Sequence, residues 1–226
     1  MSRQMPLIRA RMRDAAADVM LEAAERIMSK AGFAGATMQD IAAAAGCAVG
    51  TLYLHFKNKD ELLRGLLLKH GKPLAEEMNA LAESPAEPLE KLRHFVTSHL
   101  RWAHDHPTVT DIVGSALPLR YYDFKASLNR LLPEEHGRMQ RVELTFIQEA
   151  QTAGSIRSDI SAALLTELVD GFMFTIMDQF SARRQALGLQ QQIDVAWGFM
   201  IGGLLGPPPS GGGTRTGKPL PKKKQA

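Results

Sequence analysis

Residues 37–59 read TMQDIAAAAGCAVGTLYLHFKNK, which is a short helical pattern, a glycine and a second short helical pattern. Thr37 is an N-cap candidate with an acidic residue three positions later, a variant of the capping box. Gly46 supplies the left-handed conformation that ends a helix. In the second pattern, Val49 and Leu52 recur on one face at helical spacing. The stretch therefore predicts two short helices joined by a tight glycine turn.

Two short helices joined in this way fit a helix-turn-helix, whose second helix enters the major groove of DNA. The outer face of the second helix carries Thr51, Tyr53 and His55, which can hydrogen-bond phosphates or base edges. Gly50 lets the backbone come close to the duplex, and Lys59, at the start of the next helix, can reach a phosphate. Spacing alone does not separate this reading from an ordinary polar surface helix.

The residue types are more specific than the spacing. The stretch resembles the DNA-binding domain of the tetracycline-repressor (TetR) family of bacterial transcription regulators, over about residues 10–68; the rest of the chain matches only in helical layout. The residues that carry the resemblance are Gly32, Phe33, Ala36, Thr37, Met38, Ile41, Ala42, Ala45, Gly46, Cys47, Ala48, Gly50, Thr51, Leu52, Tyr53, His55, Phe56, Asn58, Lys59, Asp60 and Leu62.

The resemblance implies roles for individual residues of the helix-turn-helix. Phosphate contacts are expected from Thr37, Tyr53, His55 and Lys59. The positions able to approach bases are Gln39, Ala48, Val49, Gly50, Thr51 and Leu54. No arginine or lysine lies between Val49 and Phe56, so bidentate reading of guanine is not available there. Specificity then rests on backbone, hydroxyl and methyl contacts and on DNA shape.

The resemblance also implies an all-α fold in two parts. Residues 7–68 form an N-terminal three-helix DNA-binding head with the helix-turn-helix. Residues 69–206 form a C-terminal helical domain for ligand binding and dimerisation. Residues 207–226 are rich in Pro, Gly and Lys and cannot bury a core, so a disordered basic tail is expected there. Its lysines could add weak DNA affinity, or the tail could simply be solvated.

Charge is unevenly distributed along the chain, although the net charge is only +3. Residues 1–70 contain ten Lys/Arg against seven Asp/Glu, residues 71–206 twelve against seventeen, and residues 207–226 five against none. A basic N-terminal end fits DNA binding, but alone it is weak evidence. Arg3, Arg9, Arg11 and Arg13 lie in or beside a loose arm over residues 1–6 and could touch DNA or form a solvated terminus.

Hydrophobic periodicity predicts the remaining helices. A first helix over about residues 7–31 has a buried stripe, and the helix from Lys59 continues toward Leu81 with a kink or break near Gly71 and Pro73, a possible hinge. Further helices are expected over about residues 84–106, 107–117, 121–153 with an interruption at Pro133, 161–184 and 191–205. The expected stripe of the first helix is Met12, Ala16, Val19, Met20, Ala23, Ile27 and Ala31.

The last two predicted helices are apolar nearly all round, which indicates burial on two sides. The second side is expected to be another copy of the chain, because the family dimerises through its last two long helices. An effector pocket is expected among the middle helices, with a small apolar or aromatic effector. Its candidate walls, which could equally be core, are Phe95, His99, Trp102, Tyr121, Phe124, Phe146 and Phe172.

The function expected from these features is a homodimeric repressor that a small molecule releases from a pseudo-palindromic operator. The alternatives are an activator or co-repressor-dependent regulator of the same fold, and a helical interaction protein without DNA binding. Only one cysteine, Cys47, is present, which fits a reducing cytoplasm. A packed thiol is the favoured role for Cys47, and a redox switch is the alternative. The histidine spacing does not support a metal site, no cofactor is expected, and no catalytic constellation indicates an enzyme.

Overall fold

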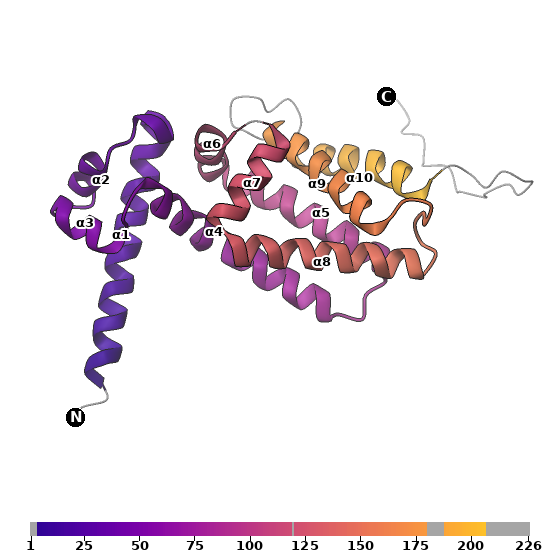
Figure 1. Cartoon of the computed structure of the whole chain (residues 1–226), viewed down its shortest axis with the longest axis horizontal. Coiled ribbons are helices and arrows are strands. Elements are labelled where there is room, and N and C mark those ends of the chain that lie inside the picture. The colour runs from indigo at the N-terminus through magenta and orange to yellow at the C-terminus, as the bar shows by residue number, and fades with distance from the viewer. Residues whose placement is uncertain (1–3, 119, 180–187, 207–226) are drawn as a thin grey trace, which may run out of the picture.

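The computed structural model describes residues 4–118, 120–179 and 188–206, and these form helices without strands (Figure 1). This confirms the all-α fold class. The predictions for Arg3, for the end of the 161–184 helix and for the basic tail lie outside these residues. The helices are α1 (Gln4–Gly35), α2 (Met38–Ala44), α3 (Val49–His55), α4 (Lys59–Glu83), α5 (Pro88–Asp105), α6 (Pro107–Ala116), α7 (Tyr121–Leu131), α8 (Pro133–Thr152), α9 (Ala162–Gln179) and α10 (Leu189–Leu205).

One hydrophobic core lies between α1, α2, α3 and the first half of α4, at the left end of Figure 1. We call this part, up to residue 68, the head. Met28, Ile41 and Leu52 are among its fully buried side chains. Ile112 of α6 and Leu131 of α7 belong to the same cluster. The head core is therefore completed by side chains from two helices that follow it in the chain.

A second core lies between α5, α8, α9 and α10, with the end of α4 packed against it. We call residues 69–206 the body. Helices α5 and α8 run side by side there, as Figure 1 shows. Phe95 and Phe146 cross edge to face inside this core, with ring centroids 6.3 Å apart. The interruption predicted at Pro133 is confirmed, since α7 ends at Leu131 and α8 begins at Pro133.

The predicted buried stripe of the first helix is partly wrong. Met12 is 68% exposed and Val19 is 51% exposed, and burial begins at Met20. The cause is visible in Figure 1, where the N-terminal turns of α1 project past α2 and α3 so that no helix covers them. Ala31 is also exposed. The expected loose arm is corrected too, because α1 is helical from Gln4.

The boundary between α4 and α5 differs from the prediction. Helix α4 continues through Gly71 and Pro73 without a break. Ser84, expected to begin the next helix, is instead the C-cap of α4, and its hydroxyl donates to the carbonyl of Leu81 at 2.8 Å. Helix α5 begins at Pro88, four residues later, where a proline suits the first helical position. A serine followed by proline can end one helix as readily as it begins another.

Candidate functional site

The helix-turn-helix consists of α2, a glycine turn and α3. Thr37 is the N-cap of α2: its hydroxyl accepts from the amide of Asp40 at 3.1 Å and donates to the carboxylate of Asp40 at 2.6 Å. Gly46 has φ of 68°, the left-handed conformation predicted for the turn. Arg26 of α1 donates to the carbonyl of Ala44 at the end of α2, at 3.1 Å. Local capping and one contact from α1 thus fix the motif.

Helix α3 turns one face to the head core and the other to solvent. Leu52 is fully buried, whereas Leu54 is 86% exposed and Tyr53 is 46% exposed. An exposed leucine beside an exposed tyrosine on a seven-residue helix indicates a surface that binds another molecule. Of the predicted DNA-contact positions, Thr37, Gln39, Ala48, Gly50, Thr51, Tyr53 and Leu54 are exposed, and Val49, His55 and Lys59 are half-buried.

Two predicted phosphate contacts already have partners inside the chain. The ammonium of Lys59 donates to the carbonyls of Phe33 at 2.8 Å and Ala34 at 3.1 Å. It also lies 5.0 Å from the centroid of the Phe33 ring. Thr37 uses its hydroxyl for capping. Both residues therefore hold the connection between α1 and α2 in place, and their contact with phosphate stays a prediction.

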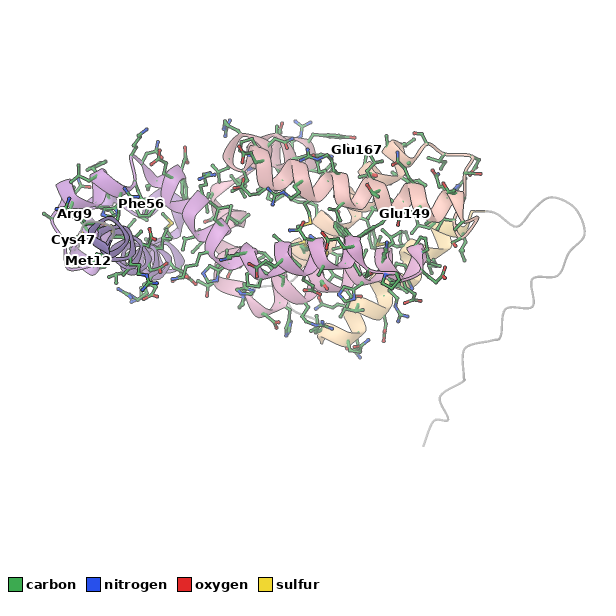
Figure 2. All side chains as sticks on the ribbon, turned by 90° about the horizontal axis from the view of Figure 1, so that it is seen from below. Arg9, Met12, Cys47, Phe56, Glu149 and Glu167 are labelled. Atoms are coloured by element: carbon green, nitrogen blue, oxygen red, sulfur yellow. The ribbon has the colours of Figure 1, made fainter. Side chains whose placement is uncertain are left out.

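The projecting part of α1 adds positive charge at the head end. Arg9, Arg11 and Arg13 are all exposed on it. Figure 2 labels Arg9 and Met12 at the same end of the molecule as Cys47 and Phe56, which flank α3. Because these arginines lie on a helix, their backbone is already ordered, and they can contact a phosphate backbone at a lower entropic cost than arginines on a loose arm.

Three of the candidate effector-site residues lie together in the body core. The rings of Phe95 and His99 are 4.2 Å apart, and Phe95 in turn contacts Phe146. The Nδ1 atom of His99 lies 2.7 Å from the carbonyl of Phe95 and donates its hydrogen to it. Burial lowers the pKa of His99, which keeps this imidazole neutral. These three residues therefore form a packed, uncharged part of the body core.

Tyr121 and Phe124 of α7 form a second aromatic group. Both rings contact Phe174 of α9, with centroid distances of 5.9 Å and 4.7 Å. These three residues are half-buried, so they lie between the body core and solvent. The position of α7 is thereby tied to α9 through aromatic contacts.

Trp102 and Phe172 lie elsewhere. The indole of Trp102 donates to the carbonyl of His70 in α4 at 2.8 Å. Phe172 stacks on Phe199 of α10, with centroids 5.1 Å apart. The seven predicted pocket residues therefore fall into separate groups, because aromatic side chains fill several interfaces of a helical bundle as well as ligand sites.

Sequence reasoning missed a set of charged side chains inside the body. We call Lys125, Glu143, Glu167 and Asp170 the buried polar cluster, after Glu143, which is buried; Lys125, Glu167 and Asp170 are half-buried at its edge. The Lys125 ammonium lies 2.5 Å from Glu167 Oε1 and 3.2 Å from Asp170 Oδ2. Tyr121 donates its hydroxyl hydrogen to Glu167 Oε2 at 3.2 Å. The signal in the sequence was the pair of acidic residues at 167 and 170 within an otherwise apolar helix pattern.

The protonation of this cluster follows from its burial. Glu143 is 1% exposed, and burial together with the charge of Asp170 and a hydrogen bond to it raises the pKa of Glu143 well above its usual range. For Lys125, burial disfavours the ammonium, but hydrogen bonds and charges from Glu167 and Asp170 outweigh it and raise its pKa. Burial and the same carboxylates also raise the pKa of Tyr121. Burial therefore favours the neutral acid form of Glu143, beside the ion pairs of Lys125 with Glu167 and Asp170.

Metal-binding and membrane-spanning features are absent from the part of the chain that the structure describes. There, no set of three or more His, Cys, Asp or Glu side chains is arranged to hold a metal ion. None of the described helices is both long and apolar enough to cross a membrane.

A family model gives the helix-turn-helix its context. The model described as "Bacterial regulatory proteins, tetR family" matches residues 20–66, from the first buried turn of α1 to the head portion of α4. Residues 20–66 thus match the tetR family of bacterial regulatory proteins. The resemblance inferred from the sequence is thereby confirmed, and the matched segment coincides with the buried part of the tetR-type head.

Curated relatives extend the likeness beyond the head. An uncharacterised HTH-type transcriptional regulator of Mycobacterium tuberculosis is 34% identical over 100 residues, which is 44% of this chain and 50% of that protein. The chain thus spans about half the length of that relative. The HTH-type transcriptional regulator UidR of Escherichia coli is 25% identical over 194 residues, covering 82% of this chain and 91% of UidR.

Solved structures agree with the whole fold. The fatty acid degradation regulator FadR of Bacillus halodurans superposes with a TM-score of 0.71 at 19% identity, covering 84% of this chain and 96% of FadR. FadR of Bacillus subtilis, solved in complex with stearoyl-CoA, gives a TM-score of 0.68 at 20% identity over 82% of this chain and 98% of that one. At these identities the tetR-family likeness shows the fold of head and body together.

Proposed function

We propose that the chain is a homodimeric transcription repressor that binds a pseudo-palindromic operator and is released from it by a small-molecule effector. The observation that carries the proposal is the exposed face of α3, with Thr51, Tyr53 and Leu54 outward and Leu52 fully buried. In this arrangement α3 is the recognition helix, and residues 37–59 supply the phosphate and base contacts. A relative from Mycolicibacterium smegmatis carries the name transcriptional repressor KstR2. A cytoplasmic location follows from this function.

Dimerisation is supported by apolar side chains on the outside of the last two helices. Leu164 and Leu168 of α9 are 52% and 55% exposed, and Val195 and Phe199 of α10 are 55% and 71% exposed. Exposure of these apolar side chains to water is unfavourable, and their burial against the same surface of a second copy, in a two-fold arrangement, would remove that cost. Two heads held in one dimer would then meet successive major grooves. Residues 69–206 would thus serve both effector binding and dimerisation, and residues 7–68 DNA binding.

The effector site is assigned to the body, on the side of α5, α7, α8 and α9. Phe95, Phe146, Tyr121 and Phe124 supply apolar and aromatic surface there, which suits an effector with an apolar or aromatic body. FadR of Bacillus subtilis, which has a similar fold, was solved in complex with stearoyl-CoA, a ligand with a long apolar chain.

Contacts made by two residues of α4 connect such a site to the head. Arg64 of α4 donates from Nε to the carbonyl of Leu131 at the end of α7, at 3.1 Å, and pairs with Glu135 of α8 at 3.4 Å. His70 of α4 contacts Glu25 of α1 at 3.0 Å. A ligand that shifts α7 therefore shifts the anchor of Arg64, and α4 carries the change to the spacing of the heads.

A gel-shift titration tests the function. Full-length protein is titrated against the DNA upstream of its own gene, with Tyr53→Ala beside the wild type. Tyr122→Ala is the matched control, because Tyr122 is 74% exposed on α7, in the body. We expect specific retardation by the wild type and the control, and loss of roughly tenfold or more in affinity for Tyr53→Ala.

The opposite results are equally informative. If folded dimer retards no sequence selected from random DNA, the regulator function is wrong. If Tyr53→Ala binds as well as the wild type, α3 is not the recognition helix. If DNA is bound only when a small molecule is added, the protein is a co-repressor-dependent regulator of the same fold.

A further inference from the structure

The buried polar cluster contains an acid whose hydrogen bonding is incomplete. Glu143 of α8 is almost fully buried, and its Oε1 atom has no hydrogen-bond partner among the described residues. Leaving a buried oxygen unpaired costs about 1–3 kcal/mol. A buried acid that the fold keeps at this cost is a candidate contact for a molecule that brings a hydrogen-bond donor.

The charges around Glu143 favour a cation. The cluster has three carboxyl groups, from Glu143, Glu167 and Asp170, and one ammonium, from Lys125. With Glu143 neutral, two carboxylates face one positive charge, so the site has a surplus of negative charge. An anion would meet repulsion from both carboxylates without a free positive partner, whereas a cation would meet attraction.

The cluster already shows how it holds an ammonium. Lys125 Nζ contacts Glu167 and Asp170, and it lies 5.8 Å from the centroid of the Tyr121 ring. Phe124 and Phe174 continue the aromatic surface beside Tyr121. Carboxylates on one side and aromatic faces on the other form an environment that suits an organic ammonium ion. The lysine stem is flexible, so its head can leave this position.

We infer that the effector is a small organic amine, whose ammonium group binds Glu143, Glu167 and Asp170 in place of Lys125 and whose apolar or aromatic part packs against Tyr121, Phe124 and Phe174. This inference rests on the proposed function, since it names the class of ligand for the same site. Displacement of Lys125 removes its ion pairs between α7 and α9, and α7 is the helix whose last carbonyl binds Arg64. Binding of the amine and release of the operator would then follow from the same movement of α7.

Calorimetry with three probes of one shape tests the charge preference. We choose 4-phenylbutylamine, 4-phenylbutan-1-ol and 4-phenylbutanoate, which carry a cation, a neutral hydroxyl and an anion at the same position. The amine is expected to bind the full-length protein roughly 10- to 100-fold more tightly than the alcohol, and the carboxylate more weakly still. In the gel shift, the amine alone should release DNA.

Two variants separate recognition from a structural role. Glu143→Leu should weaken amine binding by roughly tenfold, because it removes both oxygens that can accept a hydrogen bond from the ammonium, whereas Glu143→Gln keeps a carbonyl acceptor and should bind the amine nearly as well as the wild type. Lys125→Met should tighten amine binding, because it removes the competing cation; a merely structural ion pair predicts no such gain. Glu134→Gln, on the same helix but exposed, is the control and should bind the amine as the wild type does.

The failures are distinguishable. Three results would each overturn the amine inference while DNA binding stands. The amine and the alcohol could bind equally well, or folded wild-type protein could bind none of the probes. Folded Lys125→Met could also bind the amine no more tightly than the wild type does. Amine binding by a protein that binds no DNA sequence would sink the proposed function and leave the amine site intact.

Discussion

The head and the body differ in where their polar side chains lie. In the head, the core is made of apolar side chains such as Ile41, Leu52 and Leu62, and the hydroxyls, amides and charges lie outside. In the body, Glu143 and Lys125 lie within the bundle. A part that reads another molecule on its surface can keep a dry interior. A part that receives a ligand inside itself must keep the groups that recognise it there, at a cost in stability.

The largest effect is expected from the dry interior of the head. Leu52→Ala removes a fully buried side chain and should lower the free energy of unfolding by roughly 2–5 kcal/mol, with loss of DNA binding. Leu54→Ala, two residues along the same helix, should change stability by no more than about 0.5 kcal/mol, because Leu54 is exposed. Urea denaturation measures both. Similar destabilisation by the two variants would mean that α3 is not oriented as described.

A comparable loss is expected at the outer surface of α9 and α10. Phe199→Glu places a charge where we expect the second copy, and two-fold symmetry repeats the change across the interface. Self-association should weaken by roughly 100-fold or more, as measured by analytical ultracentrifugation. Glu90→Gln, exposed on α5, is the control for this surface. Unchanged association would exclude this surface from the dimer contact.

The polar interior of the body predicts a pH dependence. Because the pKa of Glu143 is raised in the folded state, the folded protein binds a proton that the unfolded chain releases above its ordinary pKa. Stability from this group is therefore present at low pH and lost as pH rises. Glu143→Gln removes the loss, so its advantage over the wild type should grow by about 1–3 kcal/mol between about pH 5 and pH 8. An advantage that is equal at both values would show that Glu143 ionises freely.

The connection between the two parts predicts a smaller effect. Arg64→Met removes the bond to the Leu131 carbonyl but leaves both the recognition helix and the buried polar cluster intact. The effector should still bind, and so should DNA, while the effector-induced loss of DNA affinity shrinks by about 0.5–2 kcal/mol. Fluorescence anisotropy with labelled DNA measures this difference. If the effector lowers the DNA affinity of Arg64→Met as much as that of the wild type, this contact does not transmit the effect of the effector to the head.

The smallest effect is expected from the projecting part of α1. Replacing Arg9 and Arg13 by alanine should reduce the slope of log affinity against log salt by about 0.9 for each phosphate that an arginine no longer neutralises, without changing sequence preference. Arg138→Ala, exposed on α8 in the body, is the control. An unchanged salt slope would mean that this extension points away from DNA.

Most of the head could be predicted from the sequence because its determinants are local. Thr37 caps α2 as its position indicated, and Gly46 has the expected positive φ. The errors concern Met12 and Val19, which follow the helical period but are exposed to solvent on α1. A hydrophobic period shows which face of a helix is apolar, and it does not show how far the next helix extends along that face.

The body resisted prediction for a different reason. Aromatic residues such as Phe95 and Phe172 were chosen because pockets are rich in them, yet the same side chains fill helix contacts on several sides. The residues of the buried polar cluster come from α7, α8 and α9, up to 45 positions apart for Lys125 and Asp170. Charges on separate helices look like solvated faces until the bundle brings them together.

The completion of the head core by Ile112 and Leu131 has a consequence for exchange of parts between related proteins. A hybrid that joins residues 1–68 of this chain to a foreign body would leave the head with an uncovered apolar face, unless the foreign helices present matching side chains at these two places. We expect such hybrids to fold only when the crossover lies after Leu131. The two specificities that we propose for this chain, for a DNA sequence and for a small molecule, would therefore be inherited as one piece.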